Sequence, residues 1–129
     1  MCYFLYLGTV EPISNQLIKD YSKKYSIAID RINAYLKAPT THHYYTIHLQ
    51  CACDFIGKNA KYAEETIRLF KSVQQPFEVI LLDASKNPNT DEKLNVLIAD
   101  RPLTETLSVD EWLTIYPAHL SVEKIYCIA

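Results

Sequence analysis

The alternation of side chains along residues 43–53 restricts the fold more than any other feature of the sequence. One set of alternate positions is mainly apolar: Tyr45, Ile47, Leu49, Cys51 and Cys53. The other set is mainly polar: Tyr44, Thr46, His48, Gln50 and Ala52. Because successive side chains of a β-strand point to opposite faces of a sheet, residues 43–53 are predicted to form a strand with one buried face.

Further strands are expected where short apolar or alternating runs lie between turn residues. These runs are residues 2–7, 25–29, 77–82 and 122–128. Short helical segments are expected at residues 14–24 and 32–37, the second ending before Pro39. Strands therefore outnumber helices in the expected order of elements.

Residues 93–99 fit two different structures. Leu94, Val96 and Ile98 alternate as in a strand that returns antiparallel to the strand before it. Thr90, with two acidic residues directly after it, would also suit the beginning of a helix. The alternation favours the strand.

Residues 58–73 have the clearest helical pattern. Their apolar side chains recur on one face at helical spacing: Tyr62, Thr66, Ile67, Phe70 and Val73. A second, short helix is predicted over residues 109–115, because Ser108 followed three residues later by Glu111 is the signature of a capping box. Both helices are expected to pack on the sheet.

The connections between most of the predicted strands are too short for the crossovers that parallel strands require. We therefore expect the α+β class: a single domain over residues 1–129, with a mainly antiparallel sheet and helices 58–73 and 109–115 packed on it. With 129 residues, 49% hydrophobic and 22% charged, the chain has the composition of an ordinary globular domain. Its net charge of −2 is too small to indicate a nucleic-acid partner.

The beginning of the sequence lacks the pattern of a secretory signal, since the first basic residue is Lys19 and the apolar run ends at Gly8. No stretch approaches the roughly 18 apolar residues of a membrane span. We therefore expect a cytoplasmic protein without a membrane partner, in a compartment where thiols stay reduced.

Three motifs carry a resemblance to a known family. They are the opening Met-Cys-Tyr-Phe-Leu-Tyr, the pair Tyr44-Tyr45, and Cys51-Ala52-Cys53-Asp54-Phe55. Together they resemble a family of small bacterial proteins that begin with Met-Cys-x-aromatic-Leu-Tyr and carry a Tyr-Tyr strand leading into Cys-Gly-Cys-Gly-Phe. The resemblance covers roughly the first 55 residues, and Ala52 and Asp54 replace the two family glycines. No activity is assigned to that family, so the resemblance indicates which residues to examine and implies no function.

Cys51 and Cys53 carry reactive thiols and are separated by one residue, a spacing that places both on the same side of a strand. Two residues apart in a strand, they project to the same side with Cα atoms about 6.6–6.8 Å apart, near the upper limit for a disulfide. Two thiolates on one side could bind zinc, with Cys2, Cys127 or a histidine as further ligands. Both residues also continue the apolar face of the strand, where free cysteine is often buried. Buried core thiols are the favoured interpretation, and a zinc or redox site is the alternative.

His48 shares the polar face of the predicted strand with Tyr44 and Gln50. Such a face either lines a groove or meets solvent, and exposure to solvent is favoured. If a groove forms there, these three side chains are the candidates for lining it. Nothing in the sequence fixes a substrate for them.

The sequence contains no phosphate-binding loop, dinucleotide fingerprint, metalloprotease or esterase pattern. The missing motifs argue against nucleotide binding and hydrolysis in these familiar modes. Ten tyrosines, several of them in predicted strands, provide contact area of the kind enriched at interfaces. We expect a binding or interaction module without catalytic activity or cofactor, acting on a protein partner or by self-association as a homodimer. A thiol site for zinc or redox chemistry is the alternative function.

Overall fold

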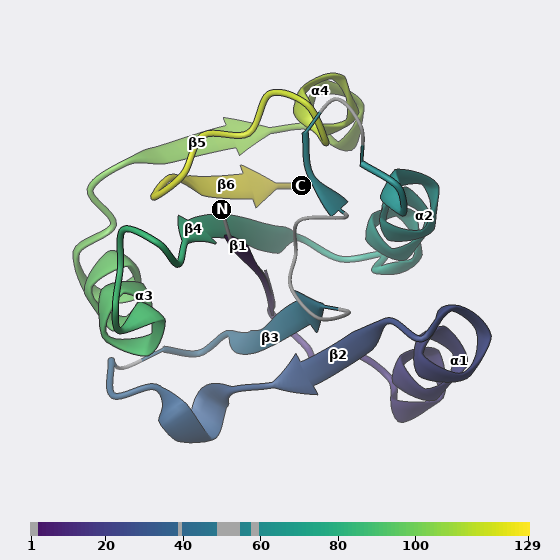
Figure 1. Cartoon of the computed structure of the whole chain (residues 1–129), viewed down its shortest axis with the longest axis horizontal. Coiled ribbons are helices and arrows are strands. Elements are labelled where there is room, and N and C mark those ends of the chain that lie inside the picture. The colour runs from purple at the N-terminus through teal and green to yellow at the C-terminus, as the bar shows by residue number, and fades with distance from the viewer. Residues whose placement is uncertain (1–2, 39, 49–54, 58–59) are drawn as a thin grey trace.

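The structure, a computed structural model, describes residues 3–38, 40–48, 55–57 and 60–129, which form a six-stranded sheet and four helices (Figure 1). In chain order the elements are β1 (Tyr3–Thr9), α1 (Asn15–Tyr25), β2 (Ala28–Arg31), the 3-10 turn η1 (Asn33–Tyr35), β3 (His43–His48), α2 (Ala63–Ser72), β4 (Phe77–Asp83), α3 (Thr90–Asp100), β5 (Thr104–Leu107), α4 (Val109–Ile115) and β6 (Ile125–Ile128). The strand order is β2-β3-β1-β4-β6-β5. All neighbours pair antiparallel except β5 and β6, which are parallel. The predicted α+β class with a mainly antiparallel sheet is confirmed.

The two central strands, β1 and β4, are covered on both faces of the sheet. Every residue of β4 is buried, which agrees with the nearly continuous apolar run in its sequence. Five of the seven residues of β1 are buried as well. A charged residue within β4, Glu78, is therefore surrounded by the interior of the protein.

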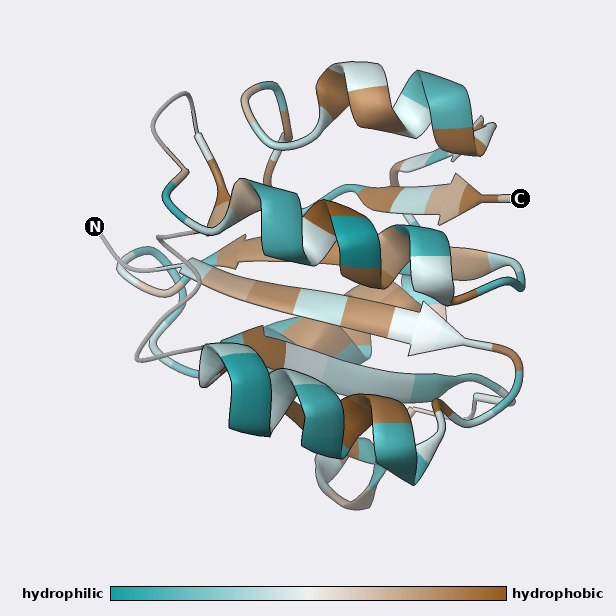
Figure 2. Cartoon of the chain, turned by 90° about the vertical axis from the view of Figure 1, so that its right-hand side faces the viewer, coloured by the Kyte–Doolittle hydropathy of each residue, from teal (hydrophilic) through white to brown (hydrophobic). Residues whose placement is uncertain are grey.

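Helices α1, α2 and α4 cover one face of the sheet, and α3 covers the other (Figures 1 and 2). The first face carries the larger hydrophobic core, which includes Leu7, Phe70 and Trp112. The core beneath α3 is smaller and includes Tyr6 and Ile80. Both faces of the sheet thus bury apolar surface. If helices covered only one face, the side chains on the other face of β4 would be exposed.

The segment 93–99 belongs to helix α3, so its prediction as a strand is wrong. Leu94, Leu97 and Ile98 lie on one face of the helix and are buried against the sheet. An alternating strand would have buried a different set of side chains. The period of the apolar positions in this segment is therefore 3.6, and the apparent alternation was accidental.

The ends of α3 explain why the helix forms here. The Asn89 side chain accepts a hydrogen bond from the backbone N–H of Glu92 at 3.0 Å and so caps the first turn. Val96, which alternation would have buried, points outward and is 44% exposed. The cap residue is Asn89, one position before the Thr90 that the sequence had suggested.

The other predicted helices are present with adjusted boundaries. Helix α2 occupies residues 63–72 of the predicted 58–73, of which residues 58 and 59 lie outside the described part. Helix α4 spans the predicted residues 109–115. Its capping box is formed, with the Ser108 hydroxyl accepting from Glu111 N at 3.1 Å and the Glu111 carboxylate accepting from Ser108 N at 2.9 Å. Both pack on the sheet, as expected, and both lie on the same face (Figure 2).

The strands differ from the prediction in several places. Strand β2 spans Ala28–Arg31 rather than residues 25–29, because Tyr25 still belongs to α1, and β6 begins at Ile125 rather than at residue 122. The predicted strand 43–53 is formed over residues 43–48, and residues 49–54 lie outside the described part of the chain. Strand β5 was not predicted, because Thr104–Leu107 is short and largely polar and lies at an edge of the sheet. Among the described residues, no helix combines the length and the apolarity that a membrane crossing requires.

Candidate functional site

A row of five residues crosses the sheet beneath the C-terminal end of α3. The strand registers align Tyr44 of β3 with Gly8 of β1, Gly8 with Glu78 of β4, Glu78 with Cys127 of β6, and Cys127 with Thr106 of β5. We call these five residues the Glu78 row. It brings together two of the residues singled out from the sequence, Tyr44 and Cys127.

Gly8 lets the Tyr44 ring cross β1 to reach Glu78. A Cβ atom on Gly8 would lie 2.5 Å from Cε1 of the ring, closer than real contacts allow. The Tyr44 hydroxyl donates a hydrogen bond of 2.7 Å to Glu78 Oε2. Burial and the negative charge of Glu78 both raise the pKa of Tyr44, which stays a neutral donor.

Arg101 closes the row from above. Its Nη2 donates to Glu78 Oε1 at 2.6 Å, and its Nη1 donates to Oε2 at 3.4 Å. Glu78 is buried and about two-fifths of the Arg101 side chain is exposed. Arg101 adopts a left-handed backbone (φ 46°) at the end of α3, where glycine or asparagine is usual and a cation suits the helix dipole. Both carboxylate oxygens of Glu78 are thus occupied, and the ion pair fixes the end of α3 to the sheet.

Cys127 lies beside this ion pair, with its Sγ 3.5 Å from Arg101 Nη2. Burial, together with the charge of Glu78, raises the pKa of the Cys127 thiol. A raised pKa keeps the thiol protonated at neutral pH, whereas nucleophiles and metal ligands are thiolates. The surroundings of Cys127 therefore suit a structural thiol better than a reactive one.

The rim of the row opens to solvent beside the loop before β3. A cavity of about 460 Å³ is lined there by Thr40, Thr41, Ile98 and Arg101. The His42 Nε2 atom lies 3.9 Å from a Glu78 oxygen, at the limit of an ion pair. Arg101 and Tyr44 already donate hydrogen bonds to both oxygens of this carboxylate.

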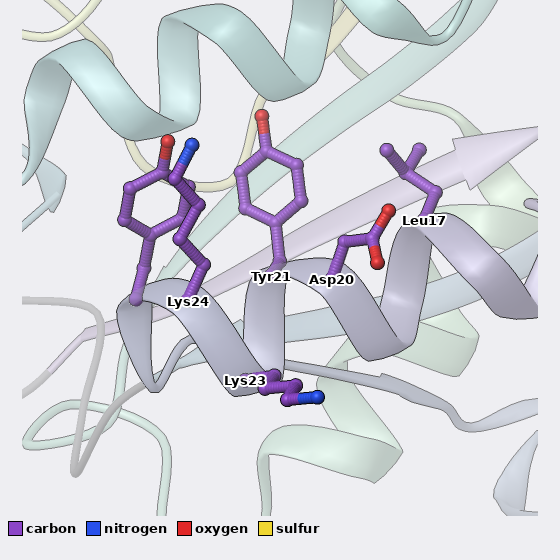
Figure 3. A pocket seen from close by; sticks show the side chains of 6 residues that line it. Leu17, Asp20, Tyr21, Lys23 and Lys24 are labelled. Carbon is purple, nitrogen blue, oxygen red and sulfur yellow. The ribbon is translucent and has the colours of Figure 1, made fainter.

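A separate groove runs along α1. The side chains of Leu17, Tyr21 and Lys24 point towards α2, whereas Lys23 points away from it (Figure 3). The volume of the groove is about 500 Å³, and its lining is Leu17, Asp20, Tyr21, Lys23, Lys24 and Tyr25. The rings of Tyr21 and Tyr25 lie 5.3 Å apart. We call this feature the α1–α2 groove.

Basic groups hold the outer tyrosine of the groove in place. Arg68 of α2 donates a hydrogen bond of 3.4 Å to the Tyr25 hydroxyl, which lowers the pKa of Tyr25. The Lys24 ammonium lies 5.3 Å from the centre of the same ring. Tyr21 lies deeper, and burial raises its pKa. The groove therefore has an aromatic floor with positive charge at its outer end.

Glu65 of α2 adds an unsatisfied acceptor near the groove. Its Oε2 atom is buried and has no hydrogen-bond partner within the described part of the chain. Its charge is close enough to Tyr21 to raise the pKa of that phenol. Buried carboxylate oxygens are normally paired, so Glu65 Oε2 is an exception in the protein interior.

The structure places the other candidates apart from both features. His48 Nε2 lies 2.8 Å from Asp30 Oδ2, and both side chains are partly exposed between β3 and β2. Tyr44 faces the same side of the sheet but is buried, so it does not line an open groove with His48. Cys2, Gln50, Cys51 and Cys53 lie outside the described residues.

Sequence reasoning missed Glu78, Arg101 and the α1–α2 groove. One signal was available for Glu78, because a single charge inside the apolar run 77–82 must find a partner if that strand is buried. No signal pointed to Arg101, whose position depends on α3 being a helix. The groove is lined by residues of α1, and which side of this helix stays open depends on tertiary packing that local sequence patterns do not specify.

Comparisons with known proteins add no assignment. No protein-family model, curated protein or solved structure matches the chain significantly. Across residues 3–38, 40–48, 55–57 and 60–129, no three histidine, cysteine or acidic side chains are grouped so as to hold a metal ion.

Proposed function

We propose that the protein is a non-catalytic binding module that holds a segment of another protein in the α1–α2 groove. One observation carries the proposal: Tyr21 and Tyr25 line one open groove, and Arg68 of α2 donates a hydrogen bond to the Tyr25 hydroxyl. Tyrosine and arginine are the residue types, with tryptophan, that contribute most to binding at protein interfaces. The groove volume of about 500 Å³ also lies within the range of binding sites.

The lining indicates what the bound segment carries. Lys23 and Lys24 line the groove and are exposed, so they would attract an acidic side chain. An apolar side chain would cover Leu17 and the ring of Tyr21. A short segment with an apolar and an acidic residue fits these requirements.

Two features of the Glu78 row support a role without catalysis. The carboxylate of Glu78 is fully engaged by Tyr44 and Arg101, and the pKa of the Cys127 thiol is raised. General bases and nucleophiles require the opposite properties. Cys127 is also a free thiol, which is usual in reducing compartments, and we propose a cytoplasmic location on this ground.

A peptide-display selection tests the groove. A random library of short peptides is selected on the full chain, and binding of enriched peptides is measured by fluorescence anisotropy. We expect enriched peptides to contain an acidic and an apolar residue. Their affinity should fall at least about tenfold with Lys24→Glu or Tyr25→Ala, because each change removes a group of the groove wall.

The matched control is Lys19→Glu. It makes the same charge change in the same helix at a residue outside the groove lining, and it should leave affinity within about twofold. Enriched peptides that bind the Lys24 and Tyr25 variants as well as the original chain would contradict the proposal. A selection without enrichment would contradict it too.

A further inference from the structure

Strand β5 forms an open edge of the sheet, at the opposite end of the strand order from β2 (Figure 1). Its parallel partner β6 uses alternate peptide groups only, since the carbonyls of Leu103 and Leu107 accept hydrogen bonds from Ile125 and Ala129. The peptide groups of Thr104 and Thr106 therefore point away from the sheet. Both threonines are exposed.

The two edges of the sheet differ in how they are protected. At the β2 edge, charged Asp30 and Arg31 stand on the strand, and α1 packs beside it. Strand β5 contains no lysine or proline, and Leu103 directly before it is 58% exposed. Threonine is a good strand residue, so β5 presents a regular template for one more strand.

We infer that β5 pairs antiparallel with β5 of a second copy of this chain, so that two sheets join into one. The inference concerns a different surface from the α1–α2 groove and does not depend on it. A second copy is the expected partner for two reasons. The register that the edge allows is self-complementary, and so are the charges beside it.

The available peptide groups leave one register for a two-fold pair. Thr104 opposite Thr106 of the other copy gives four backbone hydrogen bonds, because both residues point outward and each makes two. A shift in one direction would oppose Thr106 to Pro102, which has no N–H. A shift in the other direction would oppose Thr104 to Ser108, whose N–H is already bound by the capping-box carboxylate of Glu111.

Side chains in this register also match. Leu103 of one copy lies opposite Leu107 of the other, which covers the exposed Leu103 with a side chain that packs against the larger core. Glu105 lies opposite its own copy at the two-fold axis. Each Glu105 has Lys124 at 3.1 Å from its carboxylate, so the four charges at the axis sum to zero.

Sedimentation equilibrium of the full chain, from micromolar to millimolar concentration, tests the pairing. We expect a reversible dimer for the original chain and a monomer throughout for Thr106→Pro, which removes one outward N–H without touching a bond to β6. The matched control Thr106→Val keeps the N–H and should dimerise within about threefold of the original affinity. Circular dichroism confirms that each variant is folded.

A charge pair gives an independent second test. Glu105→Lys places four positive charges at the axis and should weaken the dimer at least about tenfold. Adding Lys124→Glu to this variant restores neutrality and should restore the dimer. The inference is overturned if the original chain stays monomeric at millimolar concentration, or if its dimer persists in Thr106→Pro. A dimer lost with Lys24→Glu but retained in Thr106→Pro would assign self-association to the groove.

Discussion

Gly8 determines whether Tyr44 can reach across β1 to Glu78. Replacing Gly8 by alanine puts a methyl group where the Tyr44 ring lies, within a buried sheet. We expect Gly8→Ala to lower the free energy of unfolding by about 1–3 kcal/mol, measured by urea denaturation. In a Tyr44→Leu background the ring is gone, and the same change should cost less than about 1 kcal/mol. Equal costs in the two backgrounds would show that the ring is not the cause.

The thiol of Cys127 reports the charge of Glu78. That charge contributes, after burial, to the raised pKa of the thiol, while Arg101 lowers it. Glu78→Gln removes the negative charge and leaves the arginine, so the pKa of Cys127 should fall and its thiolate should form at lower pH. The measurement is the pH dependence of the alkylation rate of Cys127, followed by mass spectrometry of its peptide.

Glu105→Gln is the control for this measurement, because Glu105 lies on β5 and its carboxylate is paired with Lys124. It should leave the alkylation profile of Cys127 unchanged. A profile that moves equally in both variants would mean that the negative charge of Glu78 does not act on the thiol specifically.

At the scale of single residues, the sequence allowed part of the core to be anticipated and left the burial of Tyr44 unpredicted. Tyr45 and Ile47 were expected on a buried face of their strand, and they are buried. Tyr44 was assigned to the polar face, yet it is buried as well, because its ring lies over Gly8 and its hydroxyl finds Glu78. A residue-by-residue pattern cannot reveal a contact between β3 and β4, which are not adjacent in the sheet.

Among the elements, α3 provides the sharpest test of the assigned structure. In the helix Leu97 is buried and Val96 is exposed, whereas the alternating strand would bury Val96. We expect Leu97→Ala to cost about 2–5 kcal/mol and Val96→Ala to change stability by no more than about 0.7 kcal/mol. Thermal and urea denaturation of both variants measure the difference. A larger loss for Val96→Ala would contradict the helix.

The elements that sequence patterns predicted correctly have strong local signals. The capping box at Ser108 marks the beginning of α4, and the apolar run of β4 marks a strand buried on both faces. Residues 93–99 carry both periodicities in seven positions, and only packing against the sheet decides between them. Strand β5 has no apolar pattern that would predict it, because its alternate residues Thr104 and Thr106 are exposed to solvent.

For the whole molecule, the arrangement of the sheet separates a protected centre from two different edges. Strands β1 and β4 each have a neighbour on both sides, and helices cover both of their faces (Figure 1). Strands β2 and β5 each have one neighbour. Hydrogen exchange should therefore be slowest in β1 and β4, where amides open only when the whole chain unfolds.

The same experiment distinguishes an open edge from a paired one. The amides of Glu105 and Leu107 point towards β6, so their exchange should depend little on protein concentration. The amides of Thr104 and Thr106 point outward and should exchange fast in dilute solution and more slowly when the chain is concentrated enough to dimerise. Residue-resolved NMR exchange at two concentrations measures this alternation, and Thr106→Pro should abolish the slowing at Thr104. Uniform exchange of all four amides at every concentration would contradict pairing at this edge. A second copy that pairs with β5 must slow exchange at the outward amides, which are every second amide of the strand.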